Sequence, residues 1–420
     1  MPVKKILVLQ PAYYEKFSCT AGACGEVCCR DWDIAIDKNT YDRYRGIKDP
    51  EFKALFSEGV KRVRGEKASK SNYAKIVLDE KGFCKFLRED SLCGIHAKFG
   101  EKYLGAVCKL YPRGSTMMQK GVRELSMVPS CPEVARVALF NPEPMIFKME
   151  EIPFYNTVSP LLFCKTPKFT EDKSMCFEAH AFEIRKYCIS ILQCRNMRLP
   201  GRLLAIGMML SKLSGLDPEK AVEEVPAVLN FYMNAAQGGE FEKILANTEF
   251  KKEVTVEMES LLYSMALKSF NSRRAGKAYQ KFADIIQSFL SEKGEMTYRD
   301  FYDKLDGLAA KHWEPFLDEK GYILENYFVN MVFSTLFPFA YSDILDIYQH
   351  FIILAEQYAL LRLLLCACAE KGDGITDEMI IAVLTGIAHT TGHNHDAKNV
   401  ASSYIKRGLD SLAHMSFLLK

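Results

Sequence analysis

The stretch Cys19-Thr-Ala-Gly-Ala-Cys24-Gly-Glu-Val-Cys28-Cys29 governs the interpretation of the first third of this chain, because it places four thiols within eleven positions. Four more cysteines follow at wider intervals before residue 132: Cys84, Cys93, Cys108 and Cys131. The 420-residue chain has 14 cysteines, so more than half of them lie in this region. With no sign of secretion, clustered thiols at ligand spacing favour a metal or iron–sulfur centre over disulfides.

The spacing of these eight cysteines bears on the kind of centre. Four thiolates suit either a tetrahedral zinc ion or a [4Fe–4S] cluster. Zinc motifs usually contain paired cysteines a few residues apart, and here only Cys24-x3-Cys28 fits. Ligands gathered from distant loops favour the iron–sulfur cluster, with zinc as the alternative. Adjacent Cys28 and Cys29 point in opposite directions in an extended chain, and eight thiols exceed the need of one cluster, so two centres stay possible.

The sequence changes near residue 150 from short glycine-containing motifs to helical periodicity. Residues 1–150 contain many glycines and short motifs, which predict an irregular cysteine-rich module with short helices, and Ile6 to Leu9 reads as a short strand. Residues 151–420 predict an α-helical domain, in which Ile184, Cys188 and Ile191 share one helix face. Helix starts are expected at Asp217-Pro218, Thr297 and Thr376. The expected fold class is therefore mainly α.

Charge and hydropathy restrict the partners. The chain has 55 Lys+Arg and 53 Asp+Glu, and this near-neutral balance argues against a dedicated nucleic-acid binder. The basic stretch from Lys61 to Lys75 reads as a solvated loop, with a contact surface for an acidic partner as the alternative. The apolar run Phe351 to Ala369 is interrupted by polar residues and predicts a buried helix rather than a membrane span. The N-terminal apolar run is too short for a signal peptide, so we expect a cytoplasmic protein.

Several other potential ligands are expected to be structural. The six later cysteines sit in apolar or isolated contexts and are expected to be small buried hydrophobes for the most part. The cluster His389-x3-His393-x-His395 places two histidines at helical spacing for a metal. Gly392 and Asn394 favour a surface turn or helix cap there instead.

At this point the sequence resembles a known family, the flagellin lysine-N-methylases (FliB), whose N-terminal part belongs to a group of zinc- or iron-chelating cysteine domains. The resemblance covers most of the chain and is most specific in the first 140 residues. It is carried by Cys24-Gly-Glu-Val-Cys-Cys-Arg-Asp-Trp32, Ile34-Ala-Ile-Asp37, Tyr41-x2-Tyr44, Cys84-x-Phe-Leu87, Leu92-Cys93-x-Ile-His96, Cys108-x2-Tyr-Pro-Arg113, Ser130-Cys-Pro-Glu-x-Ala-Arg136, Glu325-Asn-Tyr-Phe328 and Leu336-Phe-Pro-Phe339. The resemblance implies methyl transfer from S-adenosylmethionine to lysine side chains of flagellin, by a protein with a cysteine-bound cluster.

One departure affects the cofactor site. The chain has no G-x-G-x-x-G turn between a strand and a helix, so it does not look like a Rossmann methyltransferase, and the S-adenosylmethionine site is not located. The residues that directly follow cluster cysteines are the candidates. Tyr111 would orient the amine and Arg113 would pair with the methionine carboxylate, while Trp32 and Asp33 are candidates for cofactor binding. Packing and a structural salt bridge are the alternatives for these side chains.

Two other functions are compatible with the residues alone. One is a non-enzymatic protein in which zinc stabilises a protein-binding platform. The other is an enzyme of a different class, such as a maturation or redox factor. The metal content of the purified protein separates a cluster from a zinc platform.

Overall fold

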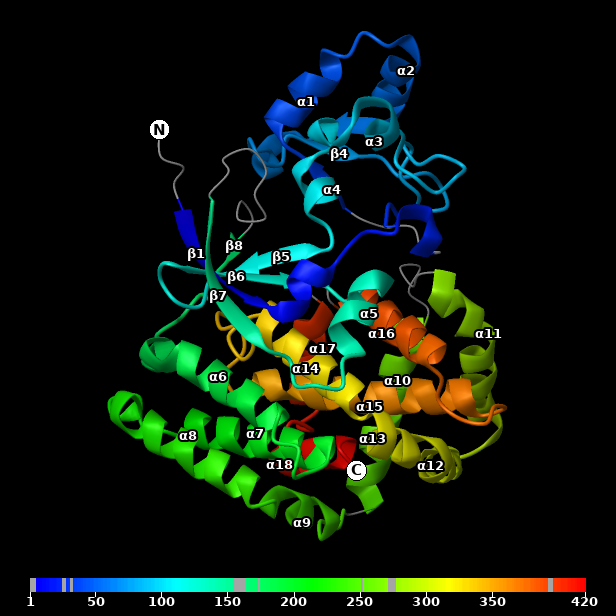
Figure 1. The fold of residues 1–420 in the computed structure, drawn as a ribbon. Helices are drawn as coiled ribbons and strands as arrows, with labels where there is room; N and C mark the ends of the chain where they lie inside the picture. The colour runs from blue at the N-terminus through cyan, green and yellow to red at the C-terminus, as the bar shows by residue number, and fades with distance from the viewer. Residues whose placement is uncertain are drawn as a thin grey trace.

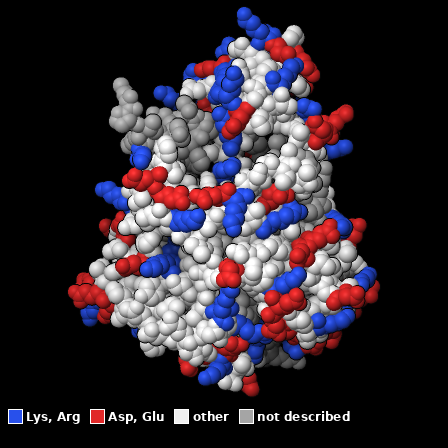
Figure 2. Space-filling model, in the orientation of Figure 1, with Lys and Arg blue, Asp and Glu red and all other residues white. Residues whose placement is uncertain are grey.

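The structure, a computed structural model, describes residues 5–24, 28–30, 33–153, 164–172, 174–250, 252–270, 277–391 and 396–420. It has three parts along the long axis of the molecule (Figure 1). A small lobe lies at one end, a mixed β-sheet lies in the middle, and a helical body forms the other end. Lys and Arg side chains are interspersed with Asp and Glu over the face that Figure 2 shows, as the near-neutral composition leads one to expect.

The lobe is built from short helices around a three-stranded sheet of order β2-β4-β3. Asp37 and Asp49 start its two longest helices, because their carboxylates accept the backbone N–H of Thr40 at 2.9 Å and of Phe52 at 2.8 Å. The elements are β2 (Ala35–Ile36), α1 (Lys38–Arg45), α2 (Pro50–Gly59), β3 (Val60–Arg62), β4 (Ala74–Ile76), α3 (Gly94–Phe99) and α4 (Ala106–Leu110). The basic stretch predicted as a loop lies largely in the β3–β4 hairpin.

The lobe has its own small aromatic core. The ring of Phe52 lies 5.7 Å from that of Tyr44, 5.8 Å from Phe86 and 5.1 Å from Phe99, measured between centroids. Such offset and edge contacts add to the free energy gained by burying the rings. The cysteines Cys29, Cys84, Cys93 and Cys108 belong to this core or pack against it. The lobe is thus more regular than the irregular module that the sequence predicts.

The middle sheet has the order β7-β1-β6-β5-β8. Its strands are β1 (Lys5–Pro11), β5 (Arg113–Thr116), β6 (Val122–Met127), β7 (Phe147–Pro153) and β8 (Cys164–Lys165). Strand β1 runs parallel to β6, with Leu7 opposite Val122, and antiparallel to β7. The strand predicted at residues 6–9 is confirmed, whereas the mainly α fold class is correct only for the helical body. The sequence conceals β6 because Glu124 and Ser126 are buried together with its apolar residues, which removes the alternating pattern of a half-exposed strand.

The helical body contains one large apolar core, and α5 from the cysteine-rich region packs into it. Its helices are α5 (Pro132–Leu139), α6 (Ala181–Leu192), α7 (Leu199–Ser214), α8 (Ala221–Gln237), α9 (Glu240–Ala246), α10 (Lys252–Phe270), α11 (Lys277–Ser291), α12 (Tyr298–Leu308), α13 (Glu314–Lys320), α14 (Tyr322–Ser334), α15 (Gln349–Ala369), α16 (Asp377–Thr391), α17 (Asp396–Ile405) and α18 (Leu412–Leu418). Helix α15 is long and apolar enough to cross a membrane, yet 94% of its apolar window is buried inside the protein. It is the buried core helix that the sequence predicts.

Two of the three predicted helix starts are confirmed. Thr297 and Asp300 form a reciprocal capping box at the start of α12. Thr376 accepts the Met379 N–H at 3.3 Å at the start of α16. Asp217 instead closes a turn by accepting the Glu219 N–H at 3.1 Å, and α8 begins only at Ala221.

A buried ion pair joins the sheet to the helical body. Glu124 on β6 is 1% exposed and Arg185 on α6 is 2% exposed. Both terminal nitrogens of Arg185 lie 2.7 Å from Oε2 of Glu124, and Thr116 donates a further hydrogen bond of 2.9 Å to the same oxygen. The guanidinium also lies 5.0 Å from the centroid of the Phe333 ring. Because water is excluded, either charge left alone would be strongly destabilising.

Helix α14 supplies a second set of polar contacts to the same junction. Asn330 donates to the backbone oxygen of Met127 at 3.1 Å and accepts a hydrogen bond from the Tyr13 hydroxyl. Asn326 donates to the backbone oxygens of Leu139 at 3.0 Å and Asn141 at 2.8 Å. These bonds hold the loop after α5 and the segment after β1 on the helical body.

We expect Arg185→Met to lower the free energy of unfolding by about 3–5 kcal/mol, because it leaves the Glu124 carboxylate buried without its partner. Urea denaturation followed by circular dichroism measures the change. The double variant Glu124→Leu, Arg185→Met should recover most of the loss. Lys281→Met, which breaks the exposed pair with Glu378, is the control and should cost under about 1 kcal/mol. A loss of that size for Arg185→Met would contradict the structural importance of the buried pair.

Candidate metal centre

Five of the eight N-terminal cysteines come together in the lobe. Backbone contacts bring three of them close, since the Cys84 N–H donates to the Cys29 oxygen at 2.9 Å and a β-bridge pairs Leu87 with Cys93. Cys93 is the residue directly before α3, and Cys108 lies within α4. Cys28 lies next to Cys29, and their thiols are hydrogen-bonded. We call Cys28, Cys29, Cys84, Cys93 and Cys108 the lobe group.

Electrostatic coupling shows that these thiols lie close to one another. Burial, together with the neighbouring thiolates of the group, raises the pKa of Cys84 to about 11 and that of Cys108 to about 12. The pKa of Cys93 is also raised, mainly by burial, although its sulfur accepts the backbone N–H groups of His96 and Ile95. Backbone N–H groups that point at sulfur favour a thiolate. Without a nearby cation, therefore, Cys84, Cys93 and Cys108 stay protonated at neutral pH.

Cys28 differs from the rest of the lobe group. The hydrogen bond from the Cys29 thiol lowers the pKa of Cys28 to about 7. The same contact raises the pKa of Cys29, because the proton it donates is then held more tightly. Cys28 is also exposed, so it is the reactive thiol of the group.

The other three cysteines form a separate group at the junction of the lobe and the helical body. Cys131 directly precedes α5, and its sulfur accepts the backbone N–H groups of Val134 and Glu133. Burial, together with the nearby thiolates of Cys24 and Cys19, raises the pKa of Cys131 to about 11. We call Cys19, Cys24 and Cys131 the junction group. The sequence presents eight cysteines as one set, whereas the structure divides them into five and three.

The thiols are not arranged as a compact single-ion site. Within the described ranges, no three His, Cys, Asp or Glu side chains converge closely enough to hold one metal ion. The thirteen cysteines whose side chains are described are all free thiols, so no disulfide is formed among them.

The predicted catalytic residues lie between the two groups. Tyr111 follows α4, which carries Cys108, and its hydroxyl lies 3.3 Å from the Ser130 hydroxyl, next to Cys131. Arg113, at the start of β5, is hydrogen-bonded to the Tyr14 hydroxyl and lies 5.2 Å from the Phe17 ring centroid.

The predicted cofactor-binding residues give less information. Asp33 is exposed and forms an ion pair of 2.5 Å with Lys75 on β4. Trp32 lies outside the described residues, as do His393 and His395. Cys188 on α6 and Cys366 and Cys368 on α15 are buried in the large core, as predicted.

Two buried ionisable side chains in the helical body were not identified as candidate functional residues from the sequence. Burial raises the pKa of Glu356 on α15 to about 8. His312 lies on a π-helical turn, Ala309–Trp313, and neither of its ring nitrogens has a hydrogen-bond partner in the described part of the chain. In the sequence, Glu356 stands out only as an interruption of an apolar run, and nothing marks the π-helical turn.

Comparisons with known proteins support the family resemblance that the sequence motifs indicate. The family model of the FliB lysine N-methylase C-terminal domain matches residues 185–418. Lysine-N-methylases of Salmonella typhimurium (strain LT2) and Salmonella choleraesuis are each 22% identical over 406 residues, covering 94% of this chain and 95% of each relative. The flagellar biosynthetic protein FliU of Salmonella muenchen is 33% identical over 144 residues, 34% of this chain and 83% of that protein. No solved structure matches the chain significantly.

We expect iodoacetamide to alkylate Cys28 about a hundredfold faster than Cys84 at pH 7 in reduced, chelator-treated protein, because only Cys28 is then substantially a thiolate. Peptide mass spectrometry measures the rates. The Cys28 rate should level off above pH 8, one unit past its pKa of about 7, whereas the Cys84 rate should still rise toward its pKa of about 11. Buried Cys188 is the unreactive control. Equal rates for Cys28 and Cys84 would contradict the thiol–thiol hydrogen bond.

Proposed function

The chain belongs to the FliB lysine N-methylase family and is an enzyme that methylates lysine, and from this premise we propose that it transfers methyl groups from S-adenosylmethionine to lysine side chains of flagellin. The observation that carries the proposal is the match to two lysine-N-methylases over nearly the full length of both chains. The similarity to a flagellar biosynthetic protein supports flagellin as the substrate. The family assignment replaces the non-enzymatic platform that the sequence alone left open.

The proposed reaction is a polar displacement. The lysine nitrogen, after losing its proton, attacks the methyl carbon of the sulfonium, a new N–C bond forms, and the S–C bond breaks to leave S-adenosylhomocysteine. A free lysine has a pKa of about 10.4, so the enzyme must favour the neutral amine. Tyr111 is our candidate to orient this amine and accept its hydrogen bond. Arg113 is the candidate to bind the methionine carboxylate.

We further propose that the lobe group holds a [4Fe–4S] cluster, with zinc as the alternative. The donor chemistry supports this, because several thiols face one another and backbone N–H groups already point at two of their sulfurs. When bound, such a cluster would stabilise the lobe or present an iron to the amino and carboxylate groups of S-adenosylmethionine.

A cytoplasmic location follows as part of the same proposal. Thiolate ligands need a reducing compartment, and the described cysteines are free thiols. No nucleic-acid or membrane partner is needed for this reaction.

We expect anaerobically purified protein to contain iron and acid-labile sulfide and to be brown. Cys84→Ala and Cys93→Ala should lose most of the iron, because these positions supply thiolates from the lobe. Cys188→Ala and Cys366→Ala are the matched controls and should retain it. Iron analysis and visible absorption measure the outcome. Colourless wild-type protein with stoichiometric zinc would overturn the cluster in favour of zinc.

Flagellin incubated with the anaerobic protein and S-adenosylmethionine should gain the mass of one methylene group for each methylation of a lysine. Tyr111→Phe should lower kcat on the order of a hundredfold, because the amine loses its hydrogen-bond partner. Tyr187→Phe on α6 is the control for removing a hydroxyl elsewhere. Intact-protein mass spectrometry follows the reaction. No mass gain with a fully loaded centre would refute flagellin as the substrate.

A further inference from the structure

The hairpin of β3 and β4 carries a one-sided group of charges. Residues 61–75 contain six Lys and Arg side chains and a single carboxylate, Glu66. The longer segment 33–112, which contains the helices and strands of the lobe, has 17 Lys and Arg and 12 Asp and Glu. That segment therefore carries a net charge of +5, and the rest of the chain, whose total is +2, carries −3. The near-neutral composition thus conceals a basic lobe in an otherwise acidic chain.

Five of the six cations lack an ion pair in the part of the chain that the structure describes. The sixth, Lys75, binds Asp33 at 2.5 Å, and Lys38 of the adjoining α1 binds Asp42 at 2.5 Å, so these two carboxylates already have partners. The five unpaired cations are all exposed, and we call them the hairpin cations: Lys61, Arg62, Arg64, Lys67 and Lys70. Like charges on one short loop repel one another, so an anionic partner is favoured there.

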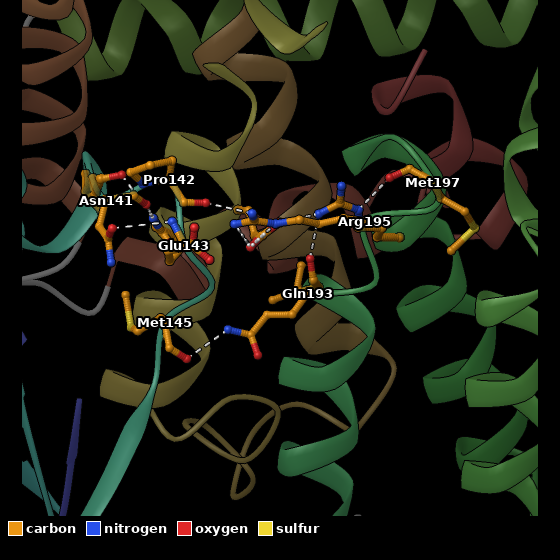
Figure 3. Close-up of polar contacts among 12 residues, drawn as sticks. Asn141, Pro142, Glu143, Met145, Gln193, Arg195 and Met197 are labelled. Atoms are coloured by element: carbon orange, nitrogen blue, oxygen red, sulfur yellow. Dashed lines mark hydrogen bonds and ion pairs between the residues drawn. The ribbon is translucent and has the colours of Figure 1, made fainter. Parts of the chain in front are cut away.

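Arginines of the helical body show a different arrangement. Arg195 directs Nε and Nη2 at the Glu325 carboxylate and donates through Nη1 to the Pro142 oxygen at 2.6 Å. Figure 3 shows this side chain extending toward the segment from Asn141 to Met145. Three further arginines of the body also bind carboxylates: Arg198, Arg202 and Arg362. The donors of the hairpin cations, in contrast, meet no carboxylate of the described chain.

The loop between β3 and β4 is held by its own hydrogen bonds. The Asn72 side chain donates to the Lys67 oxygen at 2.9 Å, and the Asn72 backbone N–H donates to the Ser69 hydroxyl at 3.0 Å. The backbone N–H of Lys38, the first residue of α1, donates to the Lys70 oxygen at 2.9 Å. Because the loop backbone is already ordered, a partner does not have to order it, which lowers the entropic cost of binding.

Aromatic rings position one of the hairpin cations, Arg62. Its guanidinium lies 3.5 Å from the centroid of the Tyr73 ring and 5.5 Å from that of Tyr41. The Arg62 Nε also donates to the Tyr73 backbone oxygen at 3.2 Å. A guanidinium that is stacked in this way still offers its terminal N–H groups to a planar anion. A carboxylate matches such a fork in geometry as well as in charge.

We propose that the hairpin cations dock an acidic segment of the protein substrate. The inference rests on the proposed function, because an enzyme that methylates lysines of a protein must hold that protein while one lysine reacts. The hairpin belongs to the lobe that carries the lobe group of thiols, so a protein bound to the hairpin is held by that same lobe. Charge complementarity selects substrates in which Asp and Glu lie near the target lysine.

Other anionic partners fit the hairpin less well. A membrane surface is bound by basic residues together with apolar anchors, and the tip, residues 64–71, has Ala68 as its single apolar side chain. A nucleic acid is bound by a chain or domain with a strong basic excess. Here Glu66 lies among the cations, and the chain outside residues 33–112 is net acidic. An acidic stretch of protein is therefore the favoured occupant.

Binding of a fluorescein-labelled deca-glutamate peptide to the full-length protein tests the surface without any turnover. Fluorescence anisotropy at low salt should detect deca-glutamate and not deca-glutamine. The neutral hairpin variant, Lys61→Gln with Arg64→Gln and Lys67→Gln, should weaken binding about fivefold or more, because three exposed ion pairs are lost. None of these three side chains forms a hydrogen bond among the described residues, so the variant should keep the circular dichroism of the wild type.

Two controls separate the hairpin from the total charge of the protein. The charge-retaining variant, Lys61→Arg with Lys67→Arg, should bind deca-glutamate like the wild type. The body variant, Lys212→Gln with Lys220→Gln and Lys243→Gln, removes as much charge from exposed positions on or next to α7, α8 and α9 and should also bind like the wild type. Raising the salt concentration should weaken wild-type binding, since exposed charges are screened.

The methylation assay connects the surface to the substrate. The neutral hairpin variant should raise the KM for flagellin about fivefold or more at low salt and leave kcat within about twofold, because the hairpin cations hold the protein and take no part in methyl transfer. Deca-glutamate binding that depends on the hairpin, with an unchanged KM for flagellin, would overturn the assignment of the surface to the substrate.

The remaining outcomes distinguish the surface from the proposed function. Equal deca-glutamate binding by the wild type and the folded neutral hairpin variant would overturn the docking surface. Stronger hairpin-dependent binding of decathymidylate, or of phosphatidylserine vesicles, would replace the acidic protein by a nucleic acid or a membrane and overturn the proposal. Hairpin-dependent binding of deca-glutamate without any methylation of flagellin by the loaded wild type would refute the proposed function and leave an anionic docking surface in place.

Discussion

The arrangement of this protein depends on the desolvated pair of Glu124 and Arg185. A carboxylate on the central strand β6 meets a guanidinium on helix α6, and neither reaches water. The pair fixes the sheet to α6, and α14 adds uncharged hydrogen bonds to the same junction through Asn326 and Asn330. These bonds also hold the loop after α5 and the segment after β1 on the helical body.

The division of the cysteines follows from this framework. The lobe group is held by short backbone links inside an aromatic core, whereas the junction group takes Cys131 from a helix that packs on the body. Tyr111 and Arg113 occupy the connection between the groups. The two candidate residues of the proposed reaction therefore lie where the lobe meets the body.

Local patterns in the sequence predicted the helical body well, because its helices depend on apolar periodicity and on caps such as Thr297 and Thr376. The same patterns failed for β6, where a buried Glu124 depends on an arginine 61 positions away. The thiol-rich character of the site was readable from spacing alone. The division of these thiols into groups of five and three could not be predicted from spacing. Cys131 comes close to Cys24 only because the chain leaves the lobe and returns to the helical body. Asn326 was part of a noted motif, but the two carbonyl oxygens that it binds lie more than 180 positions away and could not be inferred from local patterns.

The lobe is an insertion between β1 and β5, so the chain leaves the sheet and returns to it nearby. Cys24 stands on the outgoing connection, and Cys131 stands on the body shortly after the returning one. Any ion or bond held by the junction thiols would close a loop of about a hundred residues, which removes the loop-closure entropy that the open chain retains in the unfolded state. Such a closure would restrict how the lobe is oriented on the body, and it would act separately from any ion held by the lobe group. Two chemically similar but separate sets of sulfur atoms would then act on one insertion, one set inside the lobe and the other where the lobe meets the body.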